Sequence, residues 1–152
     1  MDAVMKKICL IILFSIVSFN INAQCKNLTS EDVETWLGTA LRTTFLFSYC
    51  DYKTRLTKAK TFYTDEAWTD EYQKMVLRNV VGVEGISNIV WINHPKPVKS
   101  KSGDTWVIQG QKLNINTFAI DSAGFVETTM TFYITQSKDC KLKISDIKFE
   151  TK

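Results

Sequence analysis

Two kinds of apolar periodicity divide this chain, and their order limits the folds that it can adopt. Between residues 29 and 80 the apolar side chains recur every three or four positions, as on one face of a helix. From residue 87 onward they occur in short runs separated by turn residues, which is the pattern of strands. Helices followed by strands favour an α+β fold. We therefore expect N-terminal helices packed on one face of a curved antiparallel sheet of four to five strands.

The helical half begins with a capping box, because Thr29 is followed three residues later by Asp32. Its apolar stripe starts at Val33 and continues through residues 47 and 52, which predicts one long amphipathic helix. A short second helix is expected at residues 53–60. Thr64 is expected to open a third helix, with an apolar stripe at residues 68, 72, 75 and 76 and glycines 82 and 85 at its end.

Strands are expected at residues 89–92, 105–109, 113–120 and 126–134, with Gly110 marking a bend between the second and third. Residues 121–124 form a hairpin turn in this interpretation, and residues 138–141 form the next turn. In the final strand the apolar side chains at 142 and 144 are out of phase with those at 147 and 149. A bulge near Ser145-Asp146 would return both pairs to the core.

The first twenty-three residues have the layout of a secretory signal peptide. Lys6 and Lys7 precede an apolar run at residues 8–19, and Ala23 is a small residue at a cleavage position. The run is shorter than the ~20 residues of a membrane span, although a single-pass anchor is the alternative. We predict cleavage after Ala23, a single mature domain at residues 24–152, a periplasmic or secreted location and no stable membrane insertion after cleavage.

An exported protein meets oxidising conditions, so its cysteines are candidates for a disulfide. Cys9 leaves with the signal, and Cys25, Cys50 and Cys140 remain. Cys50 lies in an apolar run and is interpreted as a small buried thiol. Cys25 and Cys140 flank polar sequence and are the better candidates for a disulfide, with Cys25 also open to lipid modification. On one continuous helix Cys25 and Cys50 would lie ~35 Å apart, too far to pair.

Charge and motif content exclude several classes of function. The chain has 19 Lys+Arg and 16 Asp+Glu residues, and they are interspersed, which argues against nucleic-acid binding. It lacks a CxxC pair, an HExxH motif, a phosphate-binding glycine loop and a GxSxG elbow. The single histidine, His94, is interpreted as a surface loop residue. Trp91 and Trp106 either line a ligand pocket or pack in the core or at an interface. We expect no catalytic, cofactor-binding or metal-binding residue.

Two segments resemble motifs of the DotI/IcmL family of type IVB secretion systems, which is related to the TraM proteins of conjugative plasmids. The first segment runs from residue 47 to 56 and the second from residue 62 to 68. The matching residues are Phe47, Tyr49, Asp51, Tyr52 and Leu56 in the first, Tyr63, Thr64 and Trp68 in the second, and Trp36 in the helix before them. Ala67 stands where the family has glycine, and the proline of the family's central strand is missing around residues 105–108.

This resemblance implies a nuclear-transport-factor-2-like half-cone in the periplasm of a Gram-negative bacterium. It also implies a non-enzymatic interaction module that acts with or beside the secretion apparatus. Its partners would be secretion-core subunits or further copies of the chain. The motif residues are expected to have structural roles, with aromatic rings at the helix–sheet boundary. The alternative is a small-molecule-binding or hydrolytic protein that uses the half-cone as its pocket.

Overall fold

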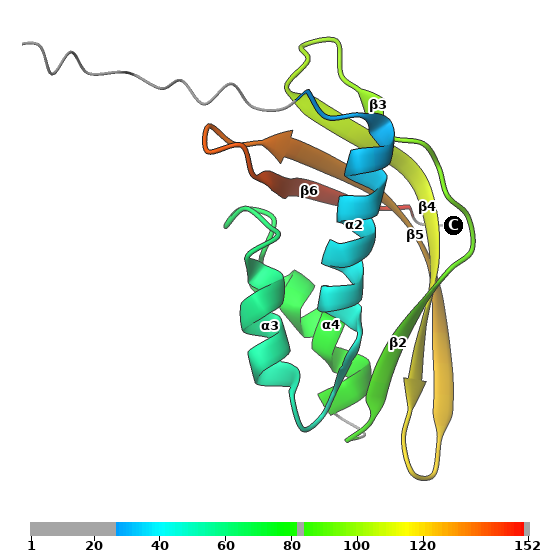
Figure 1. The fold of residues 1–152 in the computed structure, drawn as a ribbon. Helices are drawn as coiled ribbons and strands as arrows, with labels where there is room; N and C mark the ends of the chain where they lie inside the picture. The colour runs from blue at the N-terminus through cyan, green and yellow to red at the C-terminus, as the bar shows by residue number, and fades with distance from the viewer. Residues whose placement is uncertain (1–26, 82–83, 151–152) are drawn as a thin grey trace, which may run out of the picture.

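The computed structural model describes residues 27–81 and 84–150, and it confirms the expected α+β half-cone. Within these residues three helices lie on the concave side of a six-stranded antiparallel sheet (Figure 1). The elements are α2 (Ser30–Phe45), β1 (Phe47–Ser48), α3 (Tyr52–Lys60), α4 (Asp70–Val81), β2 (Ile86–Trp91), β3 (Val98–Lys99), β4 (Thr105–Phe118), β5 (Ala123–Gln136) and β6 (Leu142–Phe149). The proposed signal peptide and Cys25 lie outside the described residues.

Helix α2 begins as the sequence predicts but ends earlier. Thr29 N–H donates to Asp32 Oδ2 at 2.9 Å and Asp32 N–H donates to Thr29 Oγ1 at 3.2 Å, which is the expected capping box. The prediction of one helix through residue 52 was wrong, because α2 stops at Phe45. Ser48 N–H donates to the Asp51 carboxylate at 2.7 Å. Such local side-chain bonds compete with the helix for backbone groups, so the chain turns there and forms β1.

Helix α4 begins six residues later than predicted, at Asp70. Thr64 lies in an isolated turn, where its carbonyl accepts from Trp68 N–H at 3.0 Å, and its own N–H donates to the Ile144 carbonyl of β6 at 2.9 Å. That bond holds Thr64 beside the sheet instead of in a helix. Thr69 takes the capping role, because its Oγ1 accepts from Tyr72 N–H at 3.2 Å.

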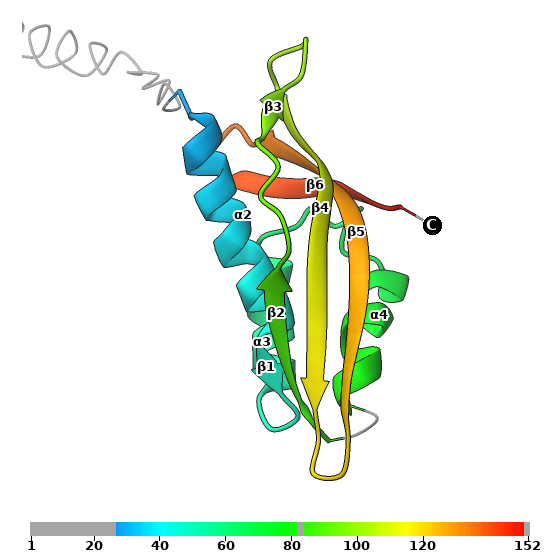
Figure 2. The ribbon, with the colours of Figure 1, turned by 90° about the vertical axis from the view of Figure 1, so that its right-hand side faces the viewer.

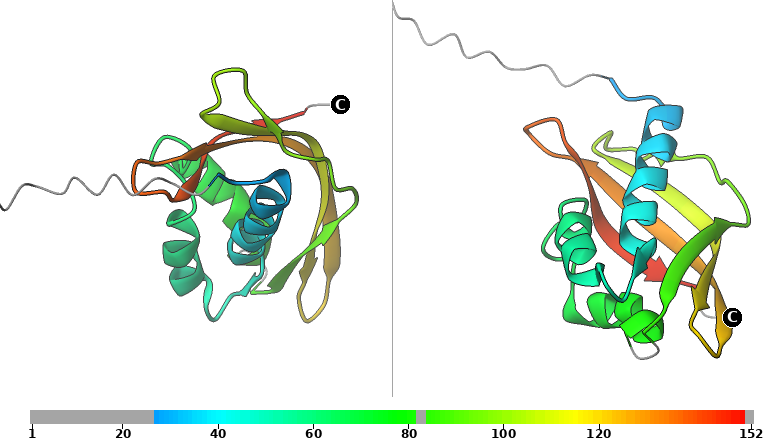
Figure 3. Two further views of the ribbon diagram at one scale, coloured as in Figure 1. Left: turned by 45° about the horizontal axis from the view of Figure 1, so that its top comes forward. Right: turned by 60° about the horizontal axis from the view of Figure 1, so that its bottom comes forward.

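The sheet has the order β1-β2-β4-β5-β6, with β3 beside β4. Both predicted irregularities are present. Gly110 has φ of 71° where the β4–β5 register shifts, so residues 105–118 form one bent strand instead of two. Ser145 is the extra residue where the β5–β6 register shifts. These bends curve the sheet around α2, as both views in Figure 3 show.

Apolar side chains from both layers fill the concave side. Fully buried positions come from α2 (Leu37, Leu41, Phe45), β4 (Ile108, Leu113), β5 (Met130, Phe132, Ile134) and β6 (Ile144). The bulge at Ser145 leaves Ile147 packed against this core but Phe149 about half exposed, so the predicted return of Phe149 to the core was wrong. The interior of the half-cone is therefore a packed core.

Candidate functional site

The residues of the first motif form the corner between α2 and α3. Asp51 receives Ser48 N–H at 2.7 Å and Ser48 Oγ at 3.0 Å, and its second oxygen binds Arg55 Nε at 3.0 Å. The bond from Ser48 N–H, followed by that from Arg55, lowers the pKa of the Asp51 carboxyl below its usual value. An ionised carboxylate therefore fixes the turn, which is a structural role.

The aromatic residues of the same motif divide between core and surface. Phe47 is buried, and Tyr52 and Leu56 pack against the core from α3. Tyr49 is exposed and stacks on Tyr52, with ring centroids 6.1 Å apart. Cys50 lies in the turn between them and is an exposed free thiol, so the prediction of a buried thiol was wrong. The reason is the early end of α2, which takes this residue out of the helical apolar face.

Inside the half-cone, Tyr63, Trp68 and Tyr72 form one aromatic cluster, with ring centroids 4.7 to 5.6 Å apart. Tyr63 Oη lies 2.8 Å from Thr44 Oγ1 and 3.0 Å from Tyr72 Oη. Thr44 Oγ1 already donates to the Ala40 carbonyl at 2.8 Å, so Tyr63 donates to Thr44 and Tyr72 donates to Tyr63. Burial raises the pKa of Tyr63 to about 12 and raises that of Tyr72 well above its usual value. These hydroxyls stay protonated and bonded to one another, which suits a core better than catalysis.

Trp36 of α2 lines a depression together with the turn that carries Cys140. Its ring packs against Phe62 at 5.9 Å, and both residues line this open depression of about 680 Å³ together with Leu28 and Cys140. Because Cys25 lies outside the described residues, the Cys25–Cys140 bridge stays a prediction. The structure adds that Leu28, three residues after Cys25, lines the same depression as Cys140.

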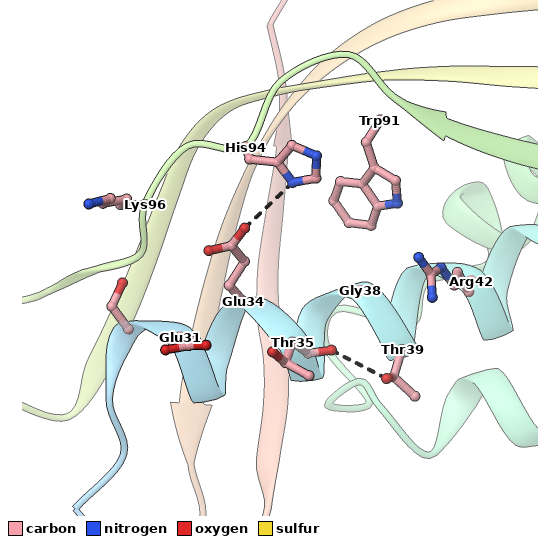
Figure 4. Close-up of a pocket in the computed structure, with 10 residues that line it drawn as sticks. Glu31, Glu34, Thr35, Gly38, Thr39, Arg42, Trp91, His94 and Lys96 are labelled. Atoms are coloured by element: carbon pink, nitrogen blue, oxygen red, sulfur yellow. Dashed lines mark hydrogen bonds and ion pairs between the residues drawn. The ribbon is translucent and has the colours of Figure 1, made fainter.

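A separate groove of about 690 Å³ lies between α2 and the chain that leaves β2. One wall is the exposed face of α2 from Ser30 to Arg42, and the other is formed by Trp91, His94 and Lys96 (Figure 4). Ser30 Oγ donates to the Pro97 carbonyl at 3.0 Å and joins the two walls at one end. This groove brings together four charged side chains (Glu31, Glu34, Arg42 and Lys96) with His94 and Trp91.

His94 occupies the middle of the groove. Its Nδ1 lies 3.5 Å from Glu34 Oε1, and its ring stacks on Trp91 with centroids 5.8 Å apart and planes 17° apart. The side chain is 65% exposed, which agrees with a surface loop residue. No sequence pattern indicated the carboxylate beside it, because Glu34 is sixty positions away on a different element. Trp106, the other tryptophan considered for a pocket, is buried in the core.

Two of the hydroxyls that line the groove bond to backbone carbonyls. Thr39 Oγ1 donates to the Thr35 carbonyl at 3.3 Å and Ser30 Oγ donates to Pro97, so neither hydroxyl is directed at His94. Within residues 27–81 and 84–150 no hydroxyl or thiol hydrogen-bonds to His94. The same residues hold no cluster of ligands suited to a metal ion. They also include no helix with the length and apolar character needed to cross a bilayer.

No known protein-family profile matches the sequence, and no curated protein sequence matches it significantly. Solved structures do match the fold. An IcmL-like type IV secretion system protein from Legionella pneumophila has a TM-score of 0.69 at 12% identity, over 81% of this chain and 93% of that chain. The periplasmic domain of DotI has a TM-score of 0.66 at 16% identity, over 82% and 97%. A periplasmic fragment of TraM has a TM-score of 0.60 at 11% identity, over 82% and 98%.

The chain has the fold of these secretion-system domains. The resemblance found in its motifs is thus confirmed at the level of structure. In this fold the motif residues lie in or against the core and at the corner between α2 and α3, with Tyr49 exposed.

Proposed function

We propose that the chain is an exported, non-enzymatic interaction module that acts with or beside a type IVB secretion apparatus in the periplasm. The observation that carries this proposal is a DotI/IcmL-like fold with a filled half-cone. A half-cone that bound a small molecule would need room where Tyr63, Trp68 and Tyr72 meet. With that space occupied, the outer surfaces are left to bind partners, either secretion-core subunits or further copies of the chain.

Export is part of the proposal. The basic, apolar and small-residue layout of residues 1–23 supports cleavage after Ala23, and the likeness to periplasmic domains supports the same compartment. The mature protein should begin at Gln24. N-terminal sequencing of the protein from cell envelopes tests this, and a product that keeps residues 1–23 and stays in the membrane after a carbonate wash would contradict it.

The test of function is a pull-down from envelope fractions with the full chain tagged at its C-terminus. Recovery of secretion-core proteins, identified by mass spectrometry, supports the proposal. The matched control is an equally tagged periplasmic protein of unrelated fold. If both baits recover the same proteins, the interaction role is wrong.

The groove around His94 defines the competing function, a small-molecule-binding or hydrolytic protein. His94, Glu34 and Trp91 are the observation in its favour, since an imidazole beside a carboxylate can exchange protons with a ligand. Turnover of an ester or amide panel that His94→Gln abolishes would favour this function over the interaction module.

A further inference from the structure

We propose that the open edge of β2 binds an extended peptide segment of a partner protein, with an acidic side chain of that peptide placed at Arg42. The inference rests on the interaction role proposed above and names the surface and the partner chemistry. Beyond the two residues that pair with β1, β2 forms the edge of the sheet next to α2 (Figure 2). The groove between them is the one described around His94.

The edge of β2 is only partly covered. β1 pairs with the first two residues of β2 and no further. Ile92 N–H donates to the Lys112 carbonyl of β4 at 3.0 Å, so the backbone of Ile92 points into the sheet. Successive residues of a strand direct their backbone N–H and C=O groups to opposite sides. The backbone groups of Ile89 and Trp91 therefore point away from β4. They face the side on which another strand would pair.

One of these groups is already satisfied. Asn88 Oδ1 accepts from Ile89 N–H at 2.7 Å. The Ile89 carbonyl and both backbone groups of Trp91 have no strand partner within the described residues. Ile89 is buried and Trp91 is partly exposed, so Trp91 carries the accessible part of this edge. Free backbone groups on an edge strand are a template for β-strand addition, in which the main chain supplies affinity and side-chain contacts supply specificity.

The dimensions of the groove fit a short strand. Its helical wall extends from Ser30 to Arg42, which is about 18 Å at the rise of an α-helix. An extended peptide covers that length with about five residues. The bond between Ser30 and the Pro97 carbonyl limits the groove at the N-terminal end of α2, so a bound peptide would lie between that bond and Arg42.

Trp91 at the end of β2 lies against Gly38 of α2. A Cβ at Gly38 would lie 3.9 Å from Trp91 Cζ2, so the indole lies close to the helix backbone. The indole is partly exposed, with His94 stacked on it, and lies beside its own free backbone groups. Aromatic side chains in such positions bind apolar peptide side chains at low entropic cost.

Charge selects the peptide at one end of the groove. Arg42 is exposed at the C-terminal end of α2 and has no carboxylate within ion-pair distance among the described residues. The Glu34 carboxylate already contacts His94 Nδ1. A guanidinium binds carboxylates with two parallel hydrogen bonds, so a peptide with Asp or Glu at this end is favoured. Glu31 and Lys96 at the other end have opposite charges and select neither sign.

The first test selects binders from a random heptapeptide library with the full-length exported protein. We expect enriched peptides to carry a carboxylate and to bind Arg42→Glu at least tenfold more weakly. Replacing that carboxylate by lysine should restore binding to the variant. The matched control is Lys58→Glu, which makes the same charge change on an exposed position of α3. Equal affinities for the wild type and Arg42→Glu would overturn the inference.

The second test addresses the backbone without changing the protein. N-methylation removes single N–H groups from the selected peptide. If the peptide adds to β2, methyl groups at alternate positions should weaken binding at least tenfold, while those at the intervening positions should have little effect. The Trp91 amide should also exchange with solvent more slowly in the complex. Uniform tolerance of N-methylation, or no enriched peptide at all, would overturn strand addition.

Failure of this inference is distinguishable from failure of the proposed function. If Arg42→Glu recovers the same secretion-core proteins from envelopes as the wild type, the interaction role holds and the groove is not its surface. If the variant loses them while Lys58→Glu keeps them, both stand.

Discussion

Replacing Tyr63 by phenylalanine tests whether the hydroxyls inside the half-cone form one directed chain. Tyr72 donates to Tyr63, Tyr63 donates to Thr44, and Thr44 donates to the Ala40 carbonyl. Tyr63→Phe removes the middle member and leaves the Tyr72 hydroxyl buried without its acceptor. An unsatisfied buried hydroxyl costs about 1–3 kcal/mol. That is a large share of the ~5–15 kcal/mol that stabilises a domain of this size.

The matched control is Tyr72→Phe, which removes the first donor of this hydrogen-bonded series of hydroxyls. Tyr63 keeps its bond to Thr44, so the expected loss is about 0.5–1.5 kcal/mol. In the double variant neither hydroxyl remains to be left unsatisfied, and Thr44 keeps the Ala40 carbonyl. Its destabilisation should therefore be about 1 kcal/mol smaller than the sum of the single losses. The assay is urea unfolding followed by tryptophan fluorescence and circular dichroism at neutral pH.

The stability of the protein at alkaline pH tests the same series of hydroxyls independently. The pKa of Tyr63 is raised to about 12 in the fold, against about 10 in an unfolded chain. Above pH 10 the unfolded state therefore loses protons that the native state keeps, and the free energy of unfolding falls as pH rises. Across this window Tyr63 accounts for about 2–3 kcal/mol of the loss. Tyr63→Phe should show a shallower decline. Equal declines, or equal effects of both single variants at neutral pH, would refute the directed chain.

Three further experiments test other parts of the structure. Trp68→Ala should destabilise the fold by ~3–5 kcal/mol in denaturant titration, because the ring is buried in the aromatic cluster; a loss below ~1 kcal/mol would contradict that burial. Gly38→Ala should raise the midpoint of thermal unfolding by stabilising α2 by about 0.5–1 kcal/mol, since the added Cβ meets Trp91 at an ordinary contact distance; a lower midpoint would show that the indole cannot accept it. Non-reducing peptide mapping should find Cys25 joined to Cys140, a closed loop of about 115 residues with ~4–5 kcal/mol of stabilisation by chain entropy. A Cys50–Cys140 peptide would disprove that pairing.

The order of elements and several local irregularities were predictable from the sequence. The capping box at Thr29 involves residues three positions apart, and both of its bonds form. Gly110 and Ser145 interrupt the alternation of their own strands, and both lie where the register shifts. In each case the signal and its consequence lie within a few residues. Local backbone preference and side-chain phase are sufficient there.

Tertiary structure decided where elements end and which distant residues meet. The apolar periodicity that begins in α2 continues past residue 47 in the sequence, yet the chain forms β1 there. Pairing with β2 and the hydrogen bonds of the Asp51 carboxylate stabilise an extended backbone and a turn instead of a helix. The Thr64 hydroxyl accepts from Ala67 N–H as a helix cap would, but the Thr64 backbone N–H bonds to β6 and no helix begins there. Glu34 and His94 meet only because α2 lies beside the chain that leaves β2. The sequence by itself determined the fold class and its local bends, since those depend on neighbours in the chain. The groove depends on packing between segments sixty residues apart, and only the folded chain brings them together.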